Sequence, residues 1–238
     1  MSIYYFDTLP STNLYLKDNS EKLNNLDGAV ARHQTSGRGR MGRTWVDQDD
    51  LLMSILIKEK IDAPERLSLL ICHTIFKVLS RYLDNVKIKW PNDILVNEKK
   101  ICGILLEGKS DNKDNIIVIG FGINVNSTSF PSDLRVTPTS MKLEIKREFS
   151  VKDLSKEVYD EFVKDFTSFK NNDTSFLDTC KRESMLINKD IYYIENGVSI
   201  KAKVVNILDN GNILLDKDGE MIEKRSGEIS LHESYQMR

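Results

Sequence analysis

The sequence predicts an α+β protein with a mixed β-sheet, flanking helices and a small all-β region at its C-terminal end. Short apolar strand patterns and longer amphipathic helix patterns are interspersed through residues 1–187. After residue 188 the helix patterns stop, and turns that contain glycine recur at short intervals. We therefore expect two domains, a larger one over residues 1–187 and a small β-barrel over residues 188–238.

The composition limits the class of protein. The chain has 238 residues and a net charge of −2, and this near-neutral balance argues against general affinity for nucleic acid or anionic membranes. Its three cysteines are widely spaced and lack metal-ligand spacing, so we expect reduced thiols in a cytoplasmic protein. No apolar run reaches the ~18 residues of a membrane span, and the N-terminal residues do not resemble a signal peptide.

The elements of the larger domain follow from local patterns. Residues 51–57 form an apolar run too continuous to leave one face of a strand in water. Pro64 suits the first position of a helix, and apolar residues from Val151 to Phe169 recur at the helical spacing of a core-facing stripe. Strands are thus predicted at 3–6, 29–33, 51–57, 86–89, 94–96, 101–106 and 116–119, and helices at about 14–23, 64–83, 150–169 and 174–186.

The small domain is predicted from its turns. Asn-Gly and Asp-Gly pairs between alternating apolar residues are strong hairpin signals, because both central positions of such turns need positive φ. Three such turns are predicted, at Glu195-Asn196-Gly197, Asp209-Asn210-Gly211 and Lys217-Asp218-Gly219.

The segment Gly37–Trp45 has the most unusual composition in the chain. It places Arg38, Arg40 and Arg43 among three glycines and ends at Trp45. Glycine allows close approach of the backbone to a ligand, and the planar guanidinium matches phosphate or carboxylate oxygens. On charge alone, the segment is equally well explained as a solvated basic loop or as a lid that closes over an anion.

Polar or glycine-rich clusters fall in five places, at 11–13, 34–45, 89–103, 120–126 and 225–230. Ser11-Thr12-Asn13 is a helix cap, with more polar groups than one cap needs, so it could also line a site. Gly103, Gly120 and Gly122 interrupt strand patterns, which indicates close approach of another group. The polar connection 126–140 is long enough to be functional.

The sequence lacks the residue patterns that several kinds of catalytic or metal site require. We find no Ser/His/Asp set, no cysteine beside a histidine, no metal-ligand pair and no GxxxxGK[ST] phosphate loop. His73 is expected to be an ordinary histidine within a helix. What remains is a cation-rich site that could bring two anions together, as activation of a carboxylate by ATP requires.

These motifs together resemble the biotin–protein ligase family, in its short form without an N-terminal DNA-binding domain. The resemblance covers nearly the whole chain, and the GRGRxGRxW and KWPND pair is specific. It rests on Ser11-Thr12-Asn13, Gly37–Trp45, Lys89-Trp90-Pro91-Asn92-Asp93, Lys100-x-x-Gly103-Ile104-Leu105-x-Glu107, Gly120-x-Gly122-Ile123-Asn124 and Gly227-Glu228-Ile229-Ser230.

The resemblance implies a class II synthetase-like catalytic domain with an SH3-like C-terminal barrel. It also implies a ligase that converts biotin and ATP, with Mg²⁺, to biotinyl-AMP and pyrophosphate. The biotinyl group then passes to a lysine of a biotin carboxyl carrier domain.

The resemblance also assigns roles to residues. The implied biotin contacts are Ser11, Thr12, Asn13, Gln34, Arg38, Gly39, Arg40, Lys100 and Gly103. The implied ATP or adenylate contacts are Arg40, Arg43, Trp45, Lys89, Asn92, Asp93 and Asn124. Lys100, Arg40 and Arg38 are the implied catalytic cations, and Asp93 is the candidate partner of Mg²⁺, with no firm metal site expected.

Two alternatives remain open at this point. A lipoate–protein ligase shares the fold and chemistry but binds an extended acyl chain. A nucleic-acid-binding module belongs to a different class, with the basic loop and the barrel as its contacts. An exposed sheet edge would also permit a homodimer or pairing with the carrier domain.

Overall fold

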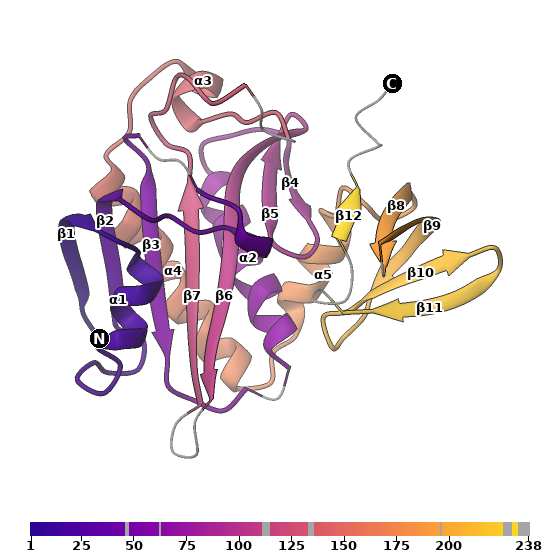
Figure 1. The fold of residues 1–238 in the computed structure, drawn as a ribbon, viewed down its shortest axis with the longest axis horizontal. Coiled ribbons are helices and arrows are strands. Elements are labelled where there is room, and N and C mark those ends of the chain that lie inside the picture. Colours follow the sequence, from indigo (N-terminus) through magenta and orange to yellow (C-terminus); the bar gives the residue numbers. More distant parts are fainter. Residues whose placement is uncertain are drawn as a thin grey trace.

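The computed structural model describes residues 1–45, 48–61, 63–110, 115–132, 136–195, 197–225 and 230–232. Figure 1 shows a large sheet flanked by helices and a smaller group of C-terminal strands beside it. The predicted α+β class is confirmed. None of the helices in the described part of the chain combines the length and apolar character that a membrane crossing needs.

The larger sheet has seven strands in the order β1-β2-β3-β7-β6-β5-β4. β1 and β2 run parallel and the other neighbours are antiparallel, so the sheet is mixed. Its strands are β1 (Ile3–Leu9), β2 (Gly28–Gln34), β3 (Leu51–Ile57), β4 (Val86–Lys89), β5 (Asp93–Val96), β6 (Lys99–Ser110) and β7 (Asn115–Ile123).

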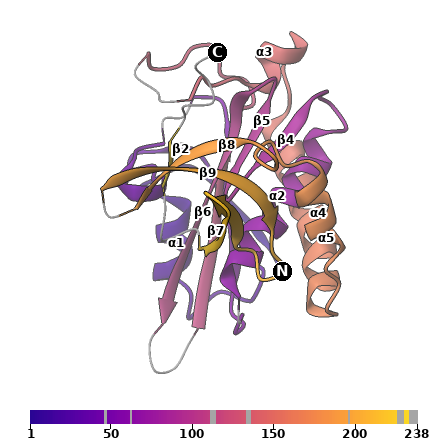
Figure 2. The same cartoon turned by 90° about the vertical axis from the view of Figure 1, so that its right-hand side faces the viewer.

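Helices cover both faces of this sheet (Figure 2). α2, α4 and α5 pack on one face over the larger apolar core, while α1 packs on the opposite face over a smaller one. The helices are α1 (Thr12–Asp18), α2 (Pro64–Leu79), α3 (Met141–Ile145), α4 (Val151–Lys170) and α5 (Ser175–Arg182), with a short 3₁₀ helix η1 (Arg40–Gly42).

β3 shows why the apolar run at 51–57 has no polar alternation. Met53 and Ile55 face the core under α2 and α4, whereas Leu56 faces the core under α1. All seven residues of β3 are buried, because strands and helices surround it on every side. The remaining pair on the α1 face, Leu52 and Ser54, lies toward the pocket described below.

The C-terminal strands form a five-stranded antiparallel sheet in the order β11-β10-β9-β8-β12. They are β8 (Asp190–Glu195), β9 (Val198–Ile207), β10 (Ile213–Lys217), β11 (Glu220–Lys224) and β12 (Ser230–His232). The indole of Trp90, which is 1% exposed, donates from Nε1 to the Gly211 carbonyl oxygen at 3.0 Å. This bond ties the small sheet to the turn between β4 and β5. The division at residues 187 and 188 stays a prediction.

Element ends differ from the predictions in identifiable ways. α1 ends at Asp18 and α2 at Leu79, so the predicted helices were too long, because buried Leu23 and Leu83 belong to the turns that follow. α5 likewise ends at Arg182. The short helix α3 was not predicted, although Ser140 caps it by accepting from Leu143 N at 3.1 Å. Asn196 of the first predicted turn lies outside the described residues.

Candidate active site

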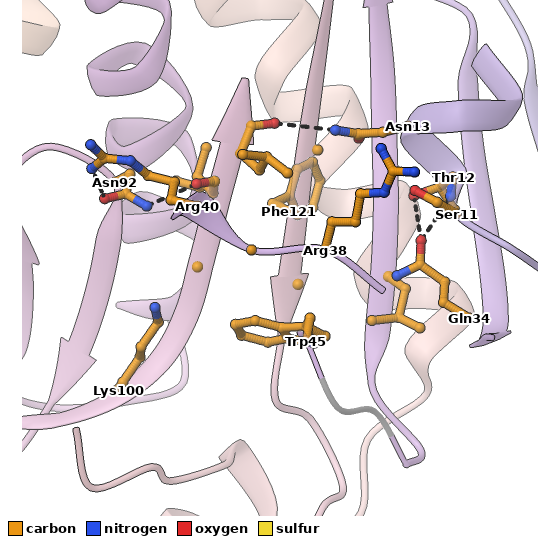
Figure 3. Close-up of a pocket in the computed structure, with 17 residues that line it drawn as sticks. Ser11, Thr12, Asn13, Gln34, Arg38, Arg40, Trp45, Asn92, Lys100 and Phe121 are labelled. Carbon is orange, nitrogen blue, oxygen red and sulfur yellow. Dashed lines mark hydrogen bonds between the residues drawn. The ribbon is translucent and has the colours of Figure 1, made fainter. Parts of the chain in front are cut away.

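A pocket opens on the α1 face of the large sheet and gathers most of the predicted site residues (Figure 3). Trp45 lies at its centre, with Lys100, Arg40 and Asn92 on one side and Ser11, Thr12 and Gln34 on the other. The predicted residues that line it are Ser11, Thr12, Asn13, Gln34, Arg38, Gly39, Arg40, Trp45, Asn92, Lys100 and Gly103. The other lining residues are Leu52, Ile104, Leu105, Gly120, Phe121 and Gly122.

The floor of the pocket is the sheet itself, with glycines at the points of closest contact. Gly122 pairs with Gly103 across β7 and β6, and a Cβ on Gly122 would lie 2.5 Å from the Trp45 indole. Gly120 lies opposite Ser54 of β3, and a Cβ there would lie 2.0 Å from Asn13 Oδ1. The predicted close approach at the strand glycines is confirmed, and both approaching groups are protein side chains.

Hydrogen bonds connect three residues that line one side of the pocket with two that do not line it. We call this group the polar wall: the lining residues Thr12, Asn13 and Gln34 together with Ser54 and Glu107. Gln34 Oε1 accepts from Thr12 N at 2.7 Å and lies 3.1 Å from Thr12 Oγ1. Ser54 Oγ lies 2.7 Å from Thr12 Oγ1 and 2.6 Å from Asn13 Oδ1. Asn13 Nδ2 donates to Glu107 Oε2 at 2.7 Å. The wall is therefore linked from α1 across three strands.

Glu107 is the last residue in this series of hydrogen bonds, and it carries a charge. Burial opposes the ionised form of its carboxylate, but hydrogen bonds from Lys17 and Asn13 outweigh burial and lower the pKa of Glu107. Lys17 Nζ lies 2.7 Å from Glu107 Oε1, and the Arg38 guanidinium lies 4.0 Å from the same oxygen. Glu107 thus borders both the polar wall and the basic loop.

The opposite side of the pocket carries cations that contact polar protein groups. Lys100 Nζ lies 2.7 Å from Asp93 Oδ1, and Arg40 donates from Nη1 to Asn92 Oδ1 at 2.9 Å. Burial is the main cause that lowers the pKa of the Arg40 guanidinium, the nearby Arg43 cation adds to it, and Asp93 opposes it. Arginine remains charged at neutral pH in such a site. An anion that enters the pocket would therefore meet fixed positive charge.

Trp45 covers the glycine floor between the two sides. Lys100 Nζ lies 5.7 Å from the centroid of its ring. The indole Nε1 is buried and has no hydrogen-bond partner among the described residues. Gly37 lies against the Trp45 carbonyl, since a Cβ at Gly37 would be 2.5 Å from that oxygen. The two ends of the arginine segment are thus packed together.

This geometry can be compared with known proteins. A sequence model of the Biotin/lipoate A/B protein ligase family matches residues 5–124. The chain belongs to this family. The Salmonella typhimurium "Bifunctional ligase/repressor BirA" is 30% identical over 243 residues, 94% of this chain and 72% of that protein. The Mycobacterium tuberculosis "Biotin--[acetyl-CoA-carboxylase] ligase" is 29% identical over 143 residues, 55% of this chain and 51% of that protein.

Solved structures agree on the fold. The biotin protein ligase from Aquifex aeolicus in complex with biotin and ATP superposes with a TM-score of 0.84 at 26% identity, covering 98% of this chain and 97% of that one. The chain spans only 37%, 40% and 46% of the lengths of three curated BirA relatives.

Four residues that the family resemblance assigns to ATP lie outside the pocket lining: Arg43, Lys89, Asp93 and Asn124. Arg43 is exposed, while Lys89 is buried and its carbonyl accepts from Asn92 N at 3.2 Å. Asn124 is buried and donates from Nδ2 to the Thr139 carbonyl at 2.9 Å. Their ATP contacts stay predictions. In the structure, Lys89 and Asn124 each make a hydrogen bond within the protein.

The other predicted clusters are only partly described. Of the family motif Gly227-Glu228-Ile229-Ser230, only Ser230 falls within the described residues, where it pairs with Ile194 in β12 and β8. The described part of the 126–140 connection passes Lys100, whose backbone N–H donates to the Thr137 carbonyl at 2.8 Å. His73 lies on α2, 3.9 Å from Asp165 and away from the pocket. Within the described ranges, no group of three His, Cys, Asp or Glu side chains is placed to hold a metal ion.

Sequence reasoning did not identify Ser54 or give Glu107 a role. Ser54 is fully buried, and its only sequence signal is one hydroxyl within the apolar run Leu51–Ile57. Glu107 belongs to a family motif, but its partners Asn13 and Lys17 are about ninety residues earlier in the chain. Only the folded sheet brings these groups together.

Proposed function

We propose that this chain joins biotin to the AMP part of ATP, with release of pyrophosphate, and then transfers biotin to a lysine of a carrier domain. The observation that carries the proposal is one pocket lined on one side by the uncharged polar groups of Ser11, Thr12 and Gln34 and on the other by Arg40 and Lys100. The names of the relatives and the biotin and ATP bound to the Aquifex aeolicus ligase support the same reaction.

The polar wall suits the ring end of biotin. The ureido group is uncharged, so a protein must recognise it through hydrogen bonds. Thr12, Ser11 and the Gln34 amide supply hydroxyl and amide groups on that side of the pocket, and Asn13 supports them. Gly103 and Gly39 also line the pocket.

The cationic side suits the reacting end. A carboxylate and an α-phosphate repel one another by roughly 4 kcal/mol for unit charges 4 Å apart at an effective dielectric near 20. Lys100, Arg40 and Arg38 would reduce this repulsion as a biotin carboxylate oxygen attacks phosphorus and the bond to pyrophosphate breaks. Positive groups fixed before the reaction stabilise such transition states without reorganisation.

The ATP side of the site draws mainly on residues outside the pocket lining. We assign Asn92, Asp93, Lys89, Arg43 and Asn124, with Trp45, to the nucleotide. Mg²⁺ would arrive with ATP, and such ions use one or two carboxylates together with phosphate oxygens. Asp93, with its oxygen buried beside Lys100, fits the role of one such carboxylate and would neutralise phosphate charge through the ion it helps to hold.

The second half-reaction requires protection from water. Biotinyl-AMP is a mixed anhydride, and an acceptor lysine amine attacks its acyl carbon as AMP leaves with the bonding electrons. The segment Gly37–Trp45 is placed to cover the pocket until then, with Trp45 over the glycine floor. We propose that residues 1–187 form the catalytic domain and that the carrier belongs to a biotin-dependent carboxylase.

An exchange assay tests the first half-reaction. We expect ATP–pyrophosphate exchange that depends on biotin and is absent with lipoate. Exchange with lipoate alone would instead identify a lipoate ligase, while salt-sensitive DNA binding without any exchange would favour a nucleic-acid module. Labelling of an added biotin-acceptor domain, dependent on both ATP and biotin, tests the second half-reaction.

Lys100 is the residue on which the proposed chemistry depends most. We expect Lys100→Ala to lower the rate of adenylate formation by about a hundred- to thousandfold, as loss of one preorganised cation typically does. Single-turnover formation of biotinyl-AMP measures this step directly. A decrease of only a few-fold would show that Lys100 does not stabilise the transition state.

A further inference from the structure

We infer that Asp50 is a positioning residue for the nucleotide, because its buried carboxylate fixes the turn of residues 124–127 on which one side of the site is built. The inference rests on the proposed function in placing ATP beside Asn124 and Lys100. Asp50 is 2% exposed, it does not belong to the pocket lining, and none of the sequence motifs above includes it.

Asp50 directly precedes β3, at the end of the large sheet where β7 also ends. Leu51 pairs with Ile123, so Asp50 lies next to the turn that follows β7. Its Oδ1 accepts from Val125 N at 2.7 Å and from Ser127 N at 3.3 Å. Its Oδ2 accepts from Ser127 Oγ at 2.5 Å. Both oxygens of the carboxylate thus hold this turn.

All the groups bonded to the carboxylate are donors. Besides the three donors of Val125 and Ser127, Gln48 N lies 3.4 Å from Oδ2. A carboxylate accepts hydrogen bonds at both oxygens, whereas an apolar side chain accepts none. Backbone N–H groups that are buried without an acceptor are costly, so the turn would move to find other partners if the carboxylate were removed. Position 50 therefore needs a side chain that accepts from the turn.

The turn in its place supports the beginning of α3. Ser140 Oγ donates to the Ser127 carbonyl at 2.6 Å, and Lys142 N donates to the Val125 carbonyl at 2.9 Å. Ser140 is fully buried and is the residue that caps α3. The start of this helix is thus docked on the turn that Asp50 holds.

The segment that leads into α3 runs beside Lys100. Lys100 N donates to the Thr137 carbonyl at 2.8 Å, and Thr139 N donates to the Lys100 carbonyl at 2.9 Å. Asn124 Nδ2 donates to the Thr139 carbonyl at 2.9 Å. Asn124 and the backbone of Lys100 are therefore joined through this segment, and its far end is docked on the turn that Asp50 holds.

The polar wall is held by separate contacts. Its hydrogen bonds run from Gln34 through Thr12 and Ser54 to Asn13 and Glu107. In the described part of the chain, none of them involves Asp50 or the turn 124–127. Loss of the Asp50 carboxylate should therefore weaken the binding of ATP and leave the binding of biotin nearly unchanged.

The test separates the two ligands in the full-length chain. ATP–pyrophosphate exchange at saturating biotin gives kcat and the KM for ATP, and calorimetry without ATP gives the dissociation constant for biotin. Asp50→Ala removes every contact of the carboxylate, so it should raise the KM for ATP at least about tenfold, more than it lowers kcat. The dissociation constant for biotin should stay within about threefold of the wild type.

Asp50→Asn is the conservative variant. Its Oδ1 can still accept from Val125 N, and the Ser127 hydroxyl can rotate to accept from the new NH₂ group. Only the 3.4 Å contact with Gln48 N is then lost. The KM for ATP should therefore remain within about threefold of the wild type, whereas a role for the negative charge itself would be lost equally in Asp50→Asn and Asp50→Ala.

Asp27→Ala controls for a general loss of stability. Asp27 is also buried, and its carboxylate accepts from Ser2 N at 2.8 Å and from Asn24 N at 2.9 Å. This variant should lower the midpoint of urea unfolding as Asp50→Ala does, but keep the KM for ATP within about threefold of the wild type. Ser127→Ala removes one of the contacts of Asp50 and should raise the KM for ATP about fivefold, which covers the case in which Asp50→Ala does not fold.

The outcomes distinguish the inference from the proposed function. An unchanged KM for ATP in Asp50→Ala, or in Ser127→Ala if Asp50→Ala does not fold, would overturn the inference alone. An equal rise of the KM for ATP in Asp50→Asn or in Asp27→Ala would do the same. Absence of biotin-dependent exchange in the wild type would overturn the proposed function and the inference together.

Discussion

The two sides of the pocket are built differently. The polar wall is linked by contacts of 2.6 to 3.1 Å that run from Gln34 through Thr12, Ser54 and Asn13 to Glu107. On the other side, the Trp45 indole N–H has no partner among the described residues, and Arg38 reaches Glu107 only at 4.0 Å. The hydrogen bonds of the wall are in place before a ligand arrives. The lid segment Gly37–Trp45 is bonded at Arg40 to Asn92, but among the described residues the Trp45 indole N–H has no partner.

This difference matches the two tasks of the proposed reaction. Recognition of an uncharged ring gains from fixed dipoles, since a preorganised wall loses little freedom on binding. The lid must instead admit ATP and later the acceptor lysine, so rigid bonds would slow it. Residues of the wall should therefore control affinity for biotin, and residues of the cationic side should control the rate.

The largest effect on the affinity for biotin is expected from the floor glycine Gly120. Gly120→Ala would drive a methyl group into Asn13, which is hydrogen-bonded to Ser54, Leu105 and Glu107. Gly122→Ala would press on the Trp45 indole of the lid. A displacement of about 1 Å at a reacting complex costs on the order of a hundredfold. We expect at least that increase in the KM for biotin in Gly120→Ala, measured by exchange.

Gly122→Ala is the matched control, because its added methyl is the same but its obstacle can move with the lid. We expect a change of about tenfold or less. A greater loss in Gly122→Ala than in Gly120→Ala would contradict the assignment of the rigid half to the polar wall.

The next effect separates two arginines of the lid. Arg40 is half-buried and bonded to Asn92, whereas Arg43 is exposed. Charge removed from a buried position is screened less by water, so Arg40→Ala should lower kcat by about a hundredfold and Arg43→Ala by only a few-fold. Steady-state exchange at saturating biotin and ATP measures both. Equal losses would place both arginines on the phosphates in the reacting complex.

Much of this arrangement could be predicted because it is local. The run Leu51–Ile57 and the strand Val86–Lys89 have the predicted bounds, and the strand glycines indicated close contacts correctly. Caps are local as well: Ser11 caps α1 by accepting from Leu14 N at 3.5 Å, as its position before the helix suggested. Each of these properties depends on residues within one or two turns or strands.

The rest depends on distant pairs. The contacts of Asn13 with Ser54 and Glu107 join residues 41 and 94 positions apart, and only the pairing of β3 with β7 and of β7 with β6 brings them together. Trp90 shows the same limit, because its motif suggested the site while its indole bonds to Gly211 in the small sheet. A motif identifies residues that matter but not which of them support the others.

The two tryptophans extend the comparison to stability. Trp90 donates its indole N–H to a buried carbonyl, and Trp45 donates to no described group. Trp90→Phe should therefore lower the free energy of unfolding by about 1 kcal/mol, or the melting temperature by about 2–4 °C. Trp45→Phe should change the free energy of unfolding by less than about 0.5 kcal/mol. Urea unfolding of both variants decides this, and an equal loss in Trp45→Phe would mean that its N–H is bonded in solution.

The smallest expected effect is the pH dependence of the polar wall. The pKa of Glu107 is lowered by folding despite its burial, so its contribution to stability is present above its ordinary pKa near 4.5 and is lost as the pH falls through the lowered value. The gap in unfolding free energy between the wild type and Glu107→Gln should be about 1 kcal/mol and constant from pH 7 to about pH 5. Below that range it should close.

Glu161 provides the contrast for this titration. Hydrogen bonds from Lys77 on α2, and then from Arg81 beyond the end of that helix, lower the pKa of Glu161 to about 2, against a smaller opposing effect of burial. Its contribution to stability should therefore persist to lower pH, and the gap between the wild type and Glu161→Gln should remain open near pH 3. Urea midpoints at pH 7, 5, 4 and 3 compare the two carboxylates directly. If the Glu107→Gln gap instead persists to pH 3, the Asn13 bond does not depend on the charge of Glu107, because a protonated carboxyl would then hold the amide equally well.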